Sequence, residues 1–319
     1  MLVPLVWVVD SAYTGELNAR IGLAERLGYF YEIIPMPCSN PITYKQILKE
    51  RYIQSTQGNK QKLLIISGTG EDTTAEIADL KMLFGDCLNI YLASILPDSP
   101  HPRLSEYDLI ASPQFSGTNI VPLISVLHNL TPDLLSEAYQ QHDDYFSSLP
   151  KPVIALLLGG NTRYCDGFNE THVIQLAQRI ASIVNSLGGF LVITNSRRTP
   201  ESALTTLLDN LAGLNYFFFD WQQKDKSFYH ALLAHADLFI ITGDSLSMCS
   251  EAAFTGKPLL VDLSEDATEI YHRELVGKLI DYGAAKVLSD QYESWSYLPL
   301  DPTGEVAKII EYRLSEAGC

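Results

Sequence analysis

Short apolar runs alternate with longer amphipathic stretches along the chain. The apolar run Leu5–Val9 precedes Glu16–Leu27, in which apolar residues recur at helical spacing and Gly28 provides a stop. The alternation continues with strands expected at Tyr31–Ile34, Leu63–Ser67, Ile90–Ala93 and Leu109–Ala111, and with a helix expected at Thr73–Phe84. Such βαβ alternation predicts a parallel, doubly wound α/β sheet.

The second half of the chain repeats this pattern. Strands are expected at Val153–Leu158, Phe190–Thr194, Tyr216–Phe219, Leu238–Thr242, Pro258–Val261 and Ala285–Leu288. Helices are expected at Asn169–Leu187, Pro200–Leu211, Ser227–Ala234, Ser245–Phe254 and Glu305–Leu314. The repetition predicts two Rossmann-like domains in tandem, with a cleft between them.

A connector separates the two patterns. Thr131-Pro132-Asp133 begins a short helix, and Leu149-Pro150-Lys151-Pro152 reads as a stiff extended joint. A chain of 319 residues also exceeds what one hydrophobic core usually serves. We therefore expect an N-terminal domain over 1–148 and a C-terminal domain over 149–319.

Charge and cysteine content limit the classes of binding partner and the cellular location that we expect. The chain holds 22 basic and 38 acidic residues, a net charge of −16 divided equally between its halves, so nucleic acid is not an expected partner. Five cysteines without CxxC or zinc-like spacing indicate reduced thiols in the cytoplasm. No apolar run approaches the ~18 residues of a membrane helix, so we expect at most peripheral contact with the inner membrane.

Ligands of doubly wound sheets bind at the carboxyl ends of the strands, where strand order reverses. The segment Thr242–Pro258 fits such a site, because a strand, a glycine turn and a hydroxyl-rich helix start follow one another. That helix start suits a phosphate, and Glu251 lies one turn beyond Ser247 to accept bonds from ribose hydroxyls. Alternatively, Asp244 or Ser245 is only an N-cap and Glu251 a solvated residue. The candidates here are Gly243, Asp244, Ser245, Ser247, Met248 and Glu251.

Two further loops follow strands of the second half. Ser196-Arg197-Arg198 offers a hydroxyl and two guanidinium forks that can grip a diphosphate, although a surface arginine pair bridging to acids is the alternative. Gly159-Gly160-Asn161 allows close backbone approach, and a plain tight turn explains it equally well. This loop is not GxGxxG, so no nicotinamide or flavin is expected. HExxH, GxSxG and P-loop motifs are absent.

The first half offers an acceptor side with fewer signals. Asp10 ends the first strand and is a candidate general base or a helix partner, and Gly15 precedes a helix. Gly68, Thr69 and Gly70 can hold a second substrate, while Glu71 and Asp72 suit a helix start. His128 is a candidate acid or base, or a core residue.

Four blocks carry a resemblance to a known family. TNSRRTP at 194–200, ITGDSLSMCSEAAFTGKP at 241–258, WVVDSAYTGELNARIGLAERLG at 7–28 and LGGNTRY at 158–164 resemble, in the same order, the bacterial and plant family named after the "elongated mitochondria" fission factor. The family's usual opening is Asp-Gly followed by Lys-Ala-Gly-His, from which this chain departs after Asp10. Ser247–Pro258 is also similar to the nucleotide-sugar segment of the GT-B transferase that makes lipid II.

The resemblance implies a GT-B glycosyltransferase fold, in which the final helix packs back on the first domain. It implies Glu251 on the ribose and Ser245 to Met248 near the diphosphate. Together with the arginine pair, this predicts a metal-independent glycosyltransferase with no cofactor. Its donor is a nucleotide-diphosphate sugar, and its acceptor is unidentified, for example a cell-envelope glycan or lipid-linked group. Alternatives are a nucleotide-sugar epimerase and a non-catalytic nucleotide-binding adaptor.

Overall fold

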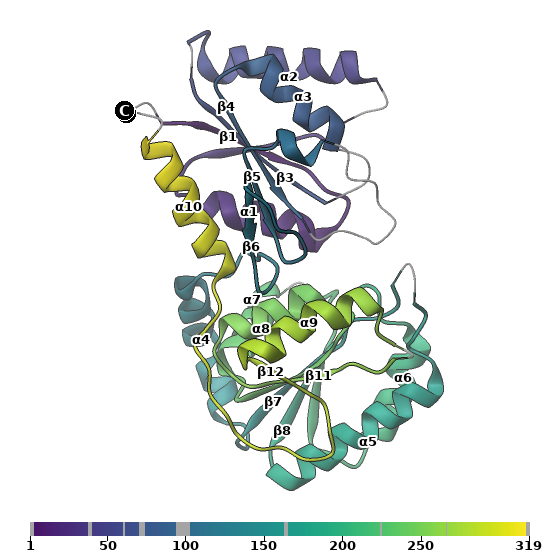
Figure 1. The fold of residues 1–319 in the computed structure, drawn as a ribbon. Coiled ribbons are helices and arrows are strands. Elements are labelled where there is room, and N and C mark those ends of the chain that lie inside the picture. The colour runs from purple at the N-terminus through teal and green to yellow at the C-terminus, as the bar shows by residue number, and fades with distance from the viewer. Residues whose placement is uncertain are drawn as a thin grey trace. The chain divides into compact units, whose positions relative to one another are not determined.

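The computed structural model describes residues 3–37, 40–59, 61–69, 74–93, 103–162, 165–223, 225–265 and 267–316. The chain divides into two compact units (Figure 1). Unit 1 comprises residues 1–129 and 301–319, and unit 2 comprises residues 130–300. The first unit is therefore built from two separate stretches of the sequence.

Unit 1 contains a six-stranded parallel sheet in the order β2-β1-β3-β4-β5-β6. Its register pairs Val8 with both Ile33 and Ile66. The strands are β1 (Leu5–Val9), β2 (Tyr31–Ile34), β3 (Leu63–Gly68), β4 (Cys87–Leu92), β5 (Leu109–Ser112) and β6 (Ile120–Pro122). The helices are α1 (Thr14–Arg26), α2 (Pro41–Thr56), α3 (Thr74–Phe84), the short 3-10 helix η1 (Leu104–Glu106) and α10 (Pro302–Glu316).

Alternate side chains of these strands feed two cores, as strand geometry requires. Trp7 and Ile65 pack with α2 and α3 on one face, whereas Val8 and Ile66 pack with α1 and α10 on the other. Both faces are covered, which explains why the strands read as continuous apolar runs.

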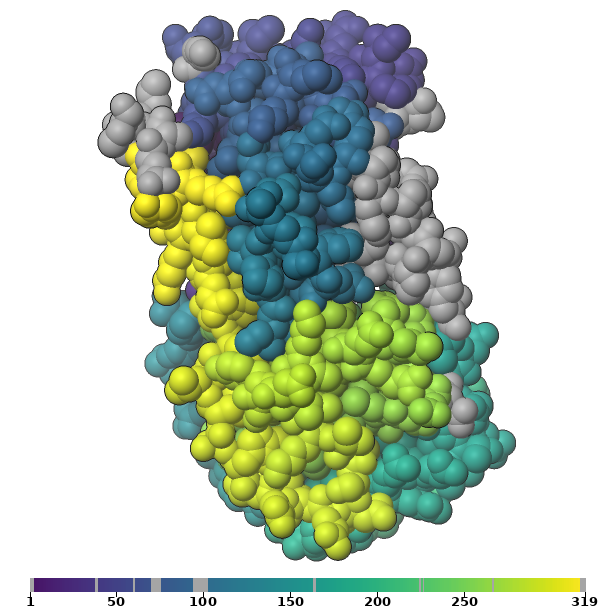
Figure 2. Space-filling view, viewed as in Figure 1, coloured from purple at the N-terminus to yellow at the C-terminus, as the bar shows by residue number. Residues whose placement is uncertain are grey.

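Helix α10 lies beside α1 (Figure 1) and is exposed on the surface of unit 1 (Figure 2). Asp301, just ahead of the helix, pairs with Arg26 of α1 at 2.9 Å. The Thr303 hydroxyl binds the backbone of His128 twice, accepting from its N–H at 3.0 Å and donating to its carbonyl at 2.8 Å. The packing of the final helix on the first domain, which the GT-B resemblance implies, is thus a feature of unit 1 itself.

Unit 2 contains a second six-stranded parallel sheet, in the order β12-β11-β10-β7-β8-β9. The strands are β7 (Val153–Leu157), β8 (Phe190–Thr194), β9 (Tyr216–Phe219), β10 (Leu238–Thr242), β11 (Leu259–Asp262) and β12 (Ala285–Val287). The helices are α4 (Pro132–Ser147), α5 (Glu170–Leu187), α6 (Glu201–Asn210), α7 (Lys226–His235), α8 (Leu246–Phe254) and α9 (Ile270–Tyr282). Helices α5 and α6 bury one face of this sheet.

The division between the units precedes α4, whereas the sequence placed the boundary after that helix, at residue 148. The reason is aromatic packing of α4 against α7. Phe146 stacks on His235 and lies 5.3 Å from Phe228, centroid to centroid, and the other face of His235 stacks on Tyr139. Prolines at 150 and 152 therefore interrupt the chain inside unit 2 rather than between domains.

The predicted fold class, two doubly wound α/β sheets, is confirmed. Strand order reverses between β1 and β3 in unit 1 and between β7 and β10 in unit 2. We call these two places switch points, and each lies at the carboxyl edge of its sheet. No helix in the part of the chain that the structure describes has both the length and the apolar character needed to cross a membrane.

Candidate functional site

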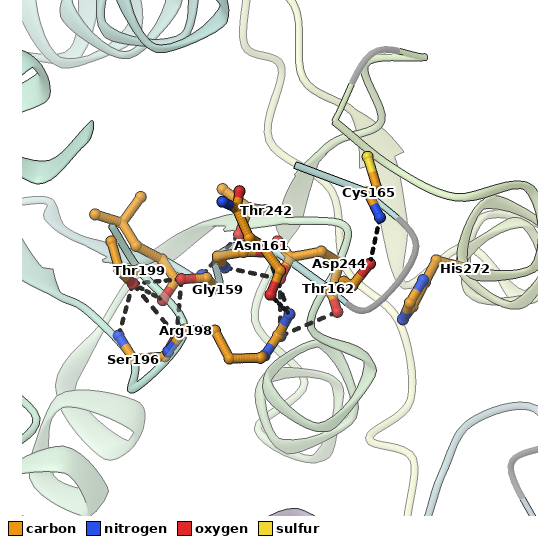
Figure 3. Close-up of polar contacts among 12 residues, drawn as sticks. Gly159, Asn161, Thr162, Cys165, Ser196, Arg198, Thr199, Thr242, Asp244 and His272 are labelled. Carbon is orange, nitrogen blue, oxygen red and sulfur yellow. Dashed lines mark hydrogen bonds and ion pairs between the residues drawn. The ribbon is translucent and has the colours of Figure 1, made fainter. Parts of the chain in front are cut away.

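Three loops meet at the switch point of unit 2, and backbone amides hold them together (Figure 3). The Gly159 N–H donates to the Thr242 hydroxyl at 2.8 Å, which joins the loop after β7 to the end of β10. The Gly160 N–H donates to Asp244 Oδ2 at 2.8 Å. The Asn161 N–H donates to the Arg198 carbonyl at 3.1 Å, which adds the loop after β8. All three predicted loops are therefore brought together.

The two glycines are required by this close packing. A Cβ atom on Gly159 would overlap the Asp244 carboxylate, and one on Gly160 would overlap the Arg198 carbonyl. Neither glycine has a positive φ, so the requirement is space rather than backbone conformation. The glycine run thus serves the meeting of three loops, which goes beyond the tight turn that the sequence also allowed.

Arg198 and Asp244 form the centre of the site. Their Nη2 and Oδ2 atoms are 2.8 Å apart, and the Asp244 side chain is buried. Burial raises the pKa of Asp244, and the neighbouring Arg198 opposes that rise. Arg198 also donates to the carbonyls of Gly160 and Asn161, at 3.2 Å each. Its guanidinium is therefore committed to holding the loops.

Arg197 differs from its neighbour, because its side chain is exposed and no partner for it is found among the described residues. The sequence predicted that both arginines grip one diphosphate. In the structure Arg198 is already bound within the protein, and Arg197 is the guanidinium open to a ligand. Sequence alone could not separate the two roles, because the carboxylate that binds Arg198 lies 46 residues further along the chain.

Ser196 is also used inside the loop cluster. Its hydroxyl donates to the Gly159 carbonyl at 2.8 Å and accepts from the Arg198 N–H at 3.2 Å. Thr199 makes a parallel contact to the same carbonyl. The Ser196 hydroxyl therefore shapes the loop in this structure.

Helix α8 begins at the same edge with an uncapped end. Ser245 is its N-cap residue but makes no side-chain cap hydrogen bond, and Asp244 is turned to Gly160 and Arg198. The alternative in which one of these residues merely caps the helix is therefore not realised. Ser247 and Met248 in the first turn are half-buried. First-turn N–H groups have no partner within their helix and carry partial positive charge.

Glu251 lies further along α8 and is not the solvated residue that the sequence allowed. Its Oε2 accepts a hydrogen bond from the Tyr229 hydroxyl of α7 at 2.5 Å. Burial raises the pKa of Glu251 to about 7, although the Tyr229 bond counteracts this. Glu251 is thus a carboxyl group already arranged to accept a hydrogen bond from a hydroxyl. Its pKa lies near neutral pH, so both its protonated and its ionised forms are populated there.

Sequence reasoning missed two parts of this edge. Glu269, Tyr271 and His272 at the start of α9 form a polar cluster with Thr162 of the β7 loop. Trp221 follows β9 and is 43% exposed, and its backbone N–H donates to Asn195 Oδ1 at 2.8 Å. Both follow strand ends of the same sheet, so extending the strand-end rule to β9 and β11 would have found them.

The switch point of unit 1 is occupied by a side chain that the sequence analysis did not single out. Arg20 of α1 is 2% exposed and donates to the carbonyls of Val9, Asp10 and Thr69 at 2.7–2.8 Å. Asp10 is half-exposed, and its Oδ1 accepts from the Ser11 N–H at 2.8 Å. Its carboxylate thus binds the loop that leads into α1.

Of the other predicted acceptor-side residues, Gly68 and Thr69 lie beside Arg20. Gly15 is exposed in the first turn of α1. A Cβ on Gly68 would overlap the Leu92 carbonyl, so this glycine serves close packing of β3 against β4. Gly70, Glu71 and Asp72 lie outside the described residues.

His128 lies in the core of unit 1. Its side chain is 2% exposed, and burial lowers its pKa to about 4. Its carbonyl also lies where a Cβ on Gly22 of α1 would fall. Of the two roles open from the sequence, the structure favours the core residue, and we assign His128 no role as acid or base. No group of three or more metal-ligating side chains occurs within the described residues.

Comparison with solved structures shows that the chain shares the fold of proteins with the GT-B fold. A UDP-GlcNAc 2-epimerase from Methanocaldococcus jannaschii aligns with a TM-score of 0.59 and 11% identity, covering 96% of this chain and 99% of that one. A UDP-GlcNAc 2-epimerase from Neisseria meningitidis, bound to UDP-GlcNAc, aligns with a TM-score of 0.55 and 13% identity, covering 98% of this chain and 99% of that one. A glycosyltransferase from Rickettsia africae aligns with a TM-score of 0.50 and 13% identity, covering 99% of this chain and 89% of that one.

The chain belongs to the mitochondrial fission ELM1 family, which it matches over residues 14–314. It is 25% identical to mitochondrial fission protein ELM1 of Arabidopsis thaliana over 284 residues, 80% of this chain and 65% of that protein. It is 30% identical to an uncharacterized protein, RP120, of Rickettsia prowazekii over 201 residues, 61% and 55% of the two chains. The chain thus spans less than two thirds of either relative. The family resemblance seen in the sequence is confirmed.

Proposed function

We propose that unit 2 binds a nucleotide-diphosphate sugar at its switch point and that the protein is a GT-B glycosyltransferase. The observation that carries the proposal is the combination of a half-buried, uncapped start of α8 with an uncommitted guanidinium on Arg197. Both features attract a diphosphate, and both lie at the edge where doubly wound sheets bind ligands. The UDP-GlcNAc bound to the Neisseria meningitidis epimerase supports a nucleotide sugar as the ligand class.

In this proposal each residue has a distinct task. The first-turn N–H groups of α8 bind the diphosphate, and Arg197 closes over it. Glu251 accepts from the ribose hydroxyls, a bond of the type that it now receives from Tyr229. The indole of Trp221 offers an apolar face on which a nucleobase can stack. Arg198 and Asp244 keep the loops in place without touching the ligand.

The chemistry proposed needs no metal ion. When the sugar leaves, negative charge builds up on the diphosphate, and a helix start together with a guanidinium stabilises it. Asp10 is the proposed general base for the acceptor hydroxyl, and Gly15, Gly68 and Thr69 remain the predicted acceptor side. The acceptor itself, such as a cell-envelope glycan, is part of the proposal.

A nucleotide-sugar epimerase is the second candidate. The observation in its favour is the cluster of Glu269, Tyr271 and His272, since epimerisation needs acid and base groups around one sugar. The same nucleotide site would serve both reactions. A non-catalytic adaptor would keep the site and bind nucleotide without turnover.

Isothermal titration calorimetry with UDP, GDP and ADP, each free and as its sugar conjugate, tests the nucleotide site. We expect one nucleotide to bind, and Arg197→Ala to weaken it about tenfold, the loss of one charge-assisted contact. Lys257→Ala is the matched control, because Lys257 is an exposed cation just beyond the opposite end of α8. Equal affinities for Arg197→Ala and the parent protein, or no binding by the whole panel, would overturn the proposal.

Product analysis with the nucleotide sugar that binds separates the candidate functions. Release of free nucleotide that depends on an added acceptor extract indicates transfer. A change in the sugar without any acceptor indicates epimerisation. Tight binding with neither reaction indicates the adaptor.

A further inference from the structure

The two carboxylate oxygens of Glu251 have different surroundings. Oε2 accepts a hydrogen bond from the Tyr229 hydroxyl of α7 at 2.5 Å, and both residues are half-buried. Among the described residues no hydrogen bond reaches Oε1, and Oε1 is not one of the buried polar atoms that lack a partner. The carboxylate is therefore held at one oxygen and open at the other.

Tyr229 lies on a helix that is well anchored in unit 2. The Asp225 carboxylate caps the start of α7 by accepting from the Ser227 N–H at 3.0 Å. The next residue, Phe228, is 8% exposed and stacks on Phe219 of β9, with ring centroids 4.8 Å apart. Tyr229 follows directly in the chain, so the packing of its neighbour fixes the turn from which its ring extends to α8.

The direction of the bond between Tyr229 and Glu251 follows from charge. Burial and the nearby Glu251 carboxylate raise the pKa of Tyr229 well above its usual value, so its hydroxyl keeps its proton and donates it. Burial also raises the pKa of Glu251 to about 7, and the bond from Tyr229 acts in the opposite direction. Among the described residues, Cys249 of α8 is the further titratable group that acts on Tyr229, and burial raises the pKa of its thiol, so it carries no charge at neutral pH. Tyr229 therefore favours the ionised form of Glu251.

We propose that Tyr229 is a positioning residue for the ribose contact: it holds Oε2 of Glu251, so that Oε1 accepts hydrogen bonds from the ribose hydroxyls. The inference rests on the proposed function, because it concerns the carboxylate that binds the ribose there. An ionised carboxylate oxygen has more than one lone pair, so Oε1 can accept from two neighbouring hydroxyls. The substrate class is thereby narrowed to nucleotides whose ribose carries free hydroxyls.

Other roles for Tyr229 give different expectations. If its hydroxyl only fastens α7 to α8, its loss affects every nucleotide alike. If it occupies the place of a ribose hydroxyl, its loss strengthens binding. If it positions Glu251, its loss weakens the binding of ribonucleotides alone, and it does so most at the pH where Glu251 is partly protonated.

The experiment measures, by calorimetry on Tyr229→Phe, the affinities of the ribonucleoside diphosphate that the panel selects and of its 2′,3′-dideoxy counterpart. At pH 7 we expect about fivefold weaker binding of the ribonucleotide and less than a twofold change for the dideoxy compound. At pH 9 Glu251 is ionised in both proteins, so the difference for the ribonucleotide should shrink to about twofold. Tyr297→Phe is the matched control, because its hydroxyl donates to the Lys257 carbonyl at 2.7 Å, beyond the other end of α8.

Glu251→Ala supplies the second arm of the test. In that background we expect Tyr229→Phe to change ribonucleotide affinity less than twofold, because Tyr229 acts through the carboxylate. A fivefold effect that persists there would overturn the inference.

The outcomes separate this inference from the proposed function. If no nucleotide of the panel binds, the proposed function fails and this inference with it. If the parent protein binds a ribonucleotide and its dideoxy form equally well, the ribose role of Glu251 fails, and so does that of Tyr229. If the parent protein prefers the ribonucleotide but Tyr229→Phe weakens both forms equally, changes neither or strengthens ribonucleotide binding, the role assigned to Tyr229 alone is wrong.

Discussion

The two switch points of this protein are filled in opposite ways. In unit 1 a buried cation, Arg20, binds three backbone carbonyls at the ends of β1 and β3. In unit 2 a buried anion, Asp244, accepts a backbone N–H and pairs with Arg198. Each sheet therefore has a charged side chain where the strand order reverses. The cation binds backbone carbonyls there, and the anion binds a backbone N–H.

The consequences for ligand binding differ. Arg20 comes from inside α1 and binds the strand-end carbonyls of unit 1, with Glu16 as its 3.6 Å partner. Asp244 comes from the loop before α8 and leaves the first turn of that helix half-buried. We infer that a charged residue at a switch point can either bind the backbone carbonyls of the strand ends or join the loops beside an uncapped helix start.

Removing Arg20 gives the largest expected effect. Arg20→Met leaves three buried carbonyls without their donor, and we expect unfolding in urea to show a loss of about 4 kcal/mol. Arg26→Met is the control from the same helix, because Arg26 makes a less buried ion pair with Asp301 and should cost about 1 kcal/mol. Similar losses from both variants would contradict this role of Arg20 as the donor to three buried carbonyls.

Removing Arg198 tests the other switch point. Asp244 has a raised pKa in the folded protein, so it favours folding when protonated, and that contribution is lost as pH rises through the folded pKa. Arg198→Met removes the opposing cation, and we expect a loss of about 3 kcal/mol at pH 8 that shrinks toward pH 4. Adding Asp244→Asn should recover part of it. A loss that does not change with pH would show that Asp244 is not the group left unpaired.

Glu251 sharpens the comparison through ligand binding. Ribose hydroxyls donate to the ionised carboxylate, so with a pKa of about 7 the nucleotide affinity should rise about tenfold between pH 6 and pH 8. Glu251→Gln should bind more weakly at pH 8 and show a flat profile. Because the pKa is raised on folding, the variant should also be the more stable protein at pH 8, and the difference should vanish near pH 4. A steep pH profile in Glu251→Gln would assign the titration to another group.

Trp221 gives the smallest expected effect. If the nucleobase stacks on its exposed ring, Trp221→Ala should weaken nucleotide binding by about 1 kcal/mol. Trp295→Ala is the control within unit 2, since that ring packs beside Tyr292 and beneath Lys286. An unchanged nucleotide affinity in Trp221→Ala would show that the nucleobase does not bind at the end of β9.

The central strands could be predicted from sequence almost to the residue, because strands buried on both faces read as uninterrupted apolar runs. Phe190–Thr194 and Leu238–Thr242 agree with the structure at both ends. Helix α2 was not predicted, because its exposed Ile42 and Ile53 obscure the apolar stripe formed by buried Tyr44 and Leu48. Apolar periodicity reports burial, and α2 buries too few of its apolar residues to show it.

The candidate site was predictable in its loops but not in its pairings. The rule that ligands bind at strand ends led to Gly159, Arg197 and Ser245 without any structure. It could not show that Arg198 serves Asp244, because that pairing depends on how two distant loops meet. Arg20 escaped notice because a single arginine within an amphipathic helix carries no motif.

The return of α10 to unit 1 has a consequence for how the protein is made. The core that α1 covers is completed by Val306, Ala307 and Ile310 of α10. Unit 1 therefore cannot finish folding until the ribosome has passed residue 310. Unit 2 is encoded without interruption between these two stretches, so its whole sequence is synthesised first. During synthesis the sheet face that α1 covers therefore stays incomplete until α10 has been made, and this face is where chaperones would be needed most.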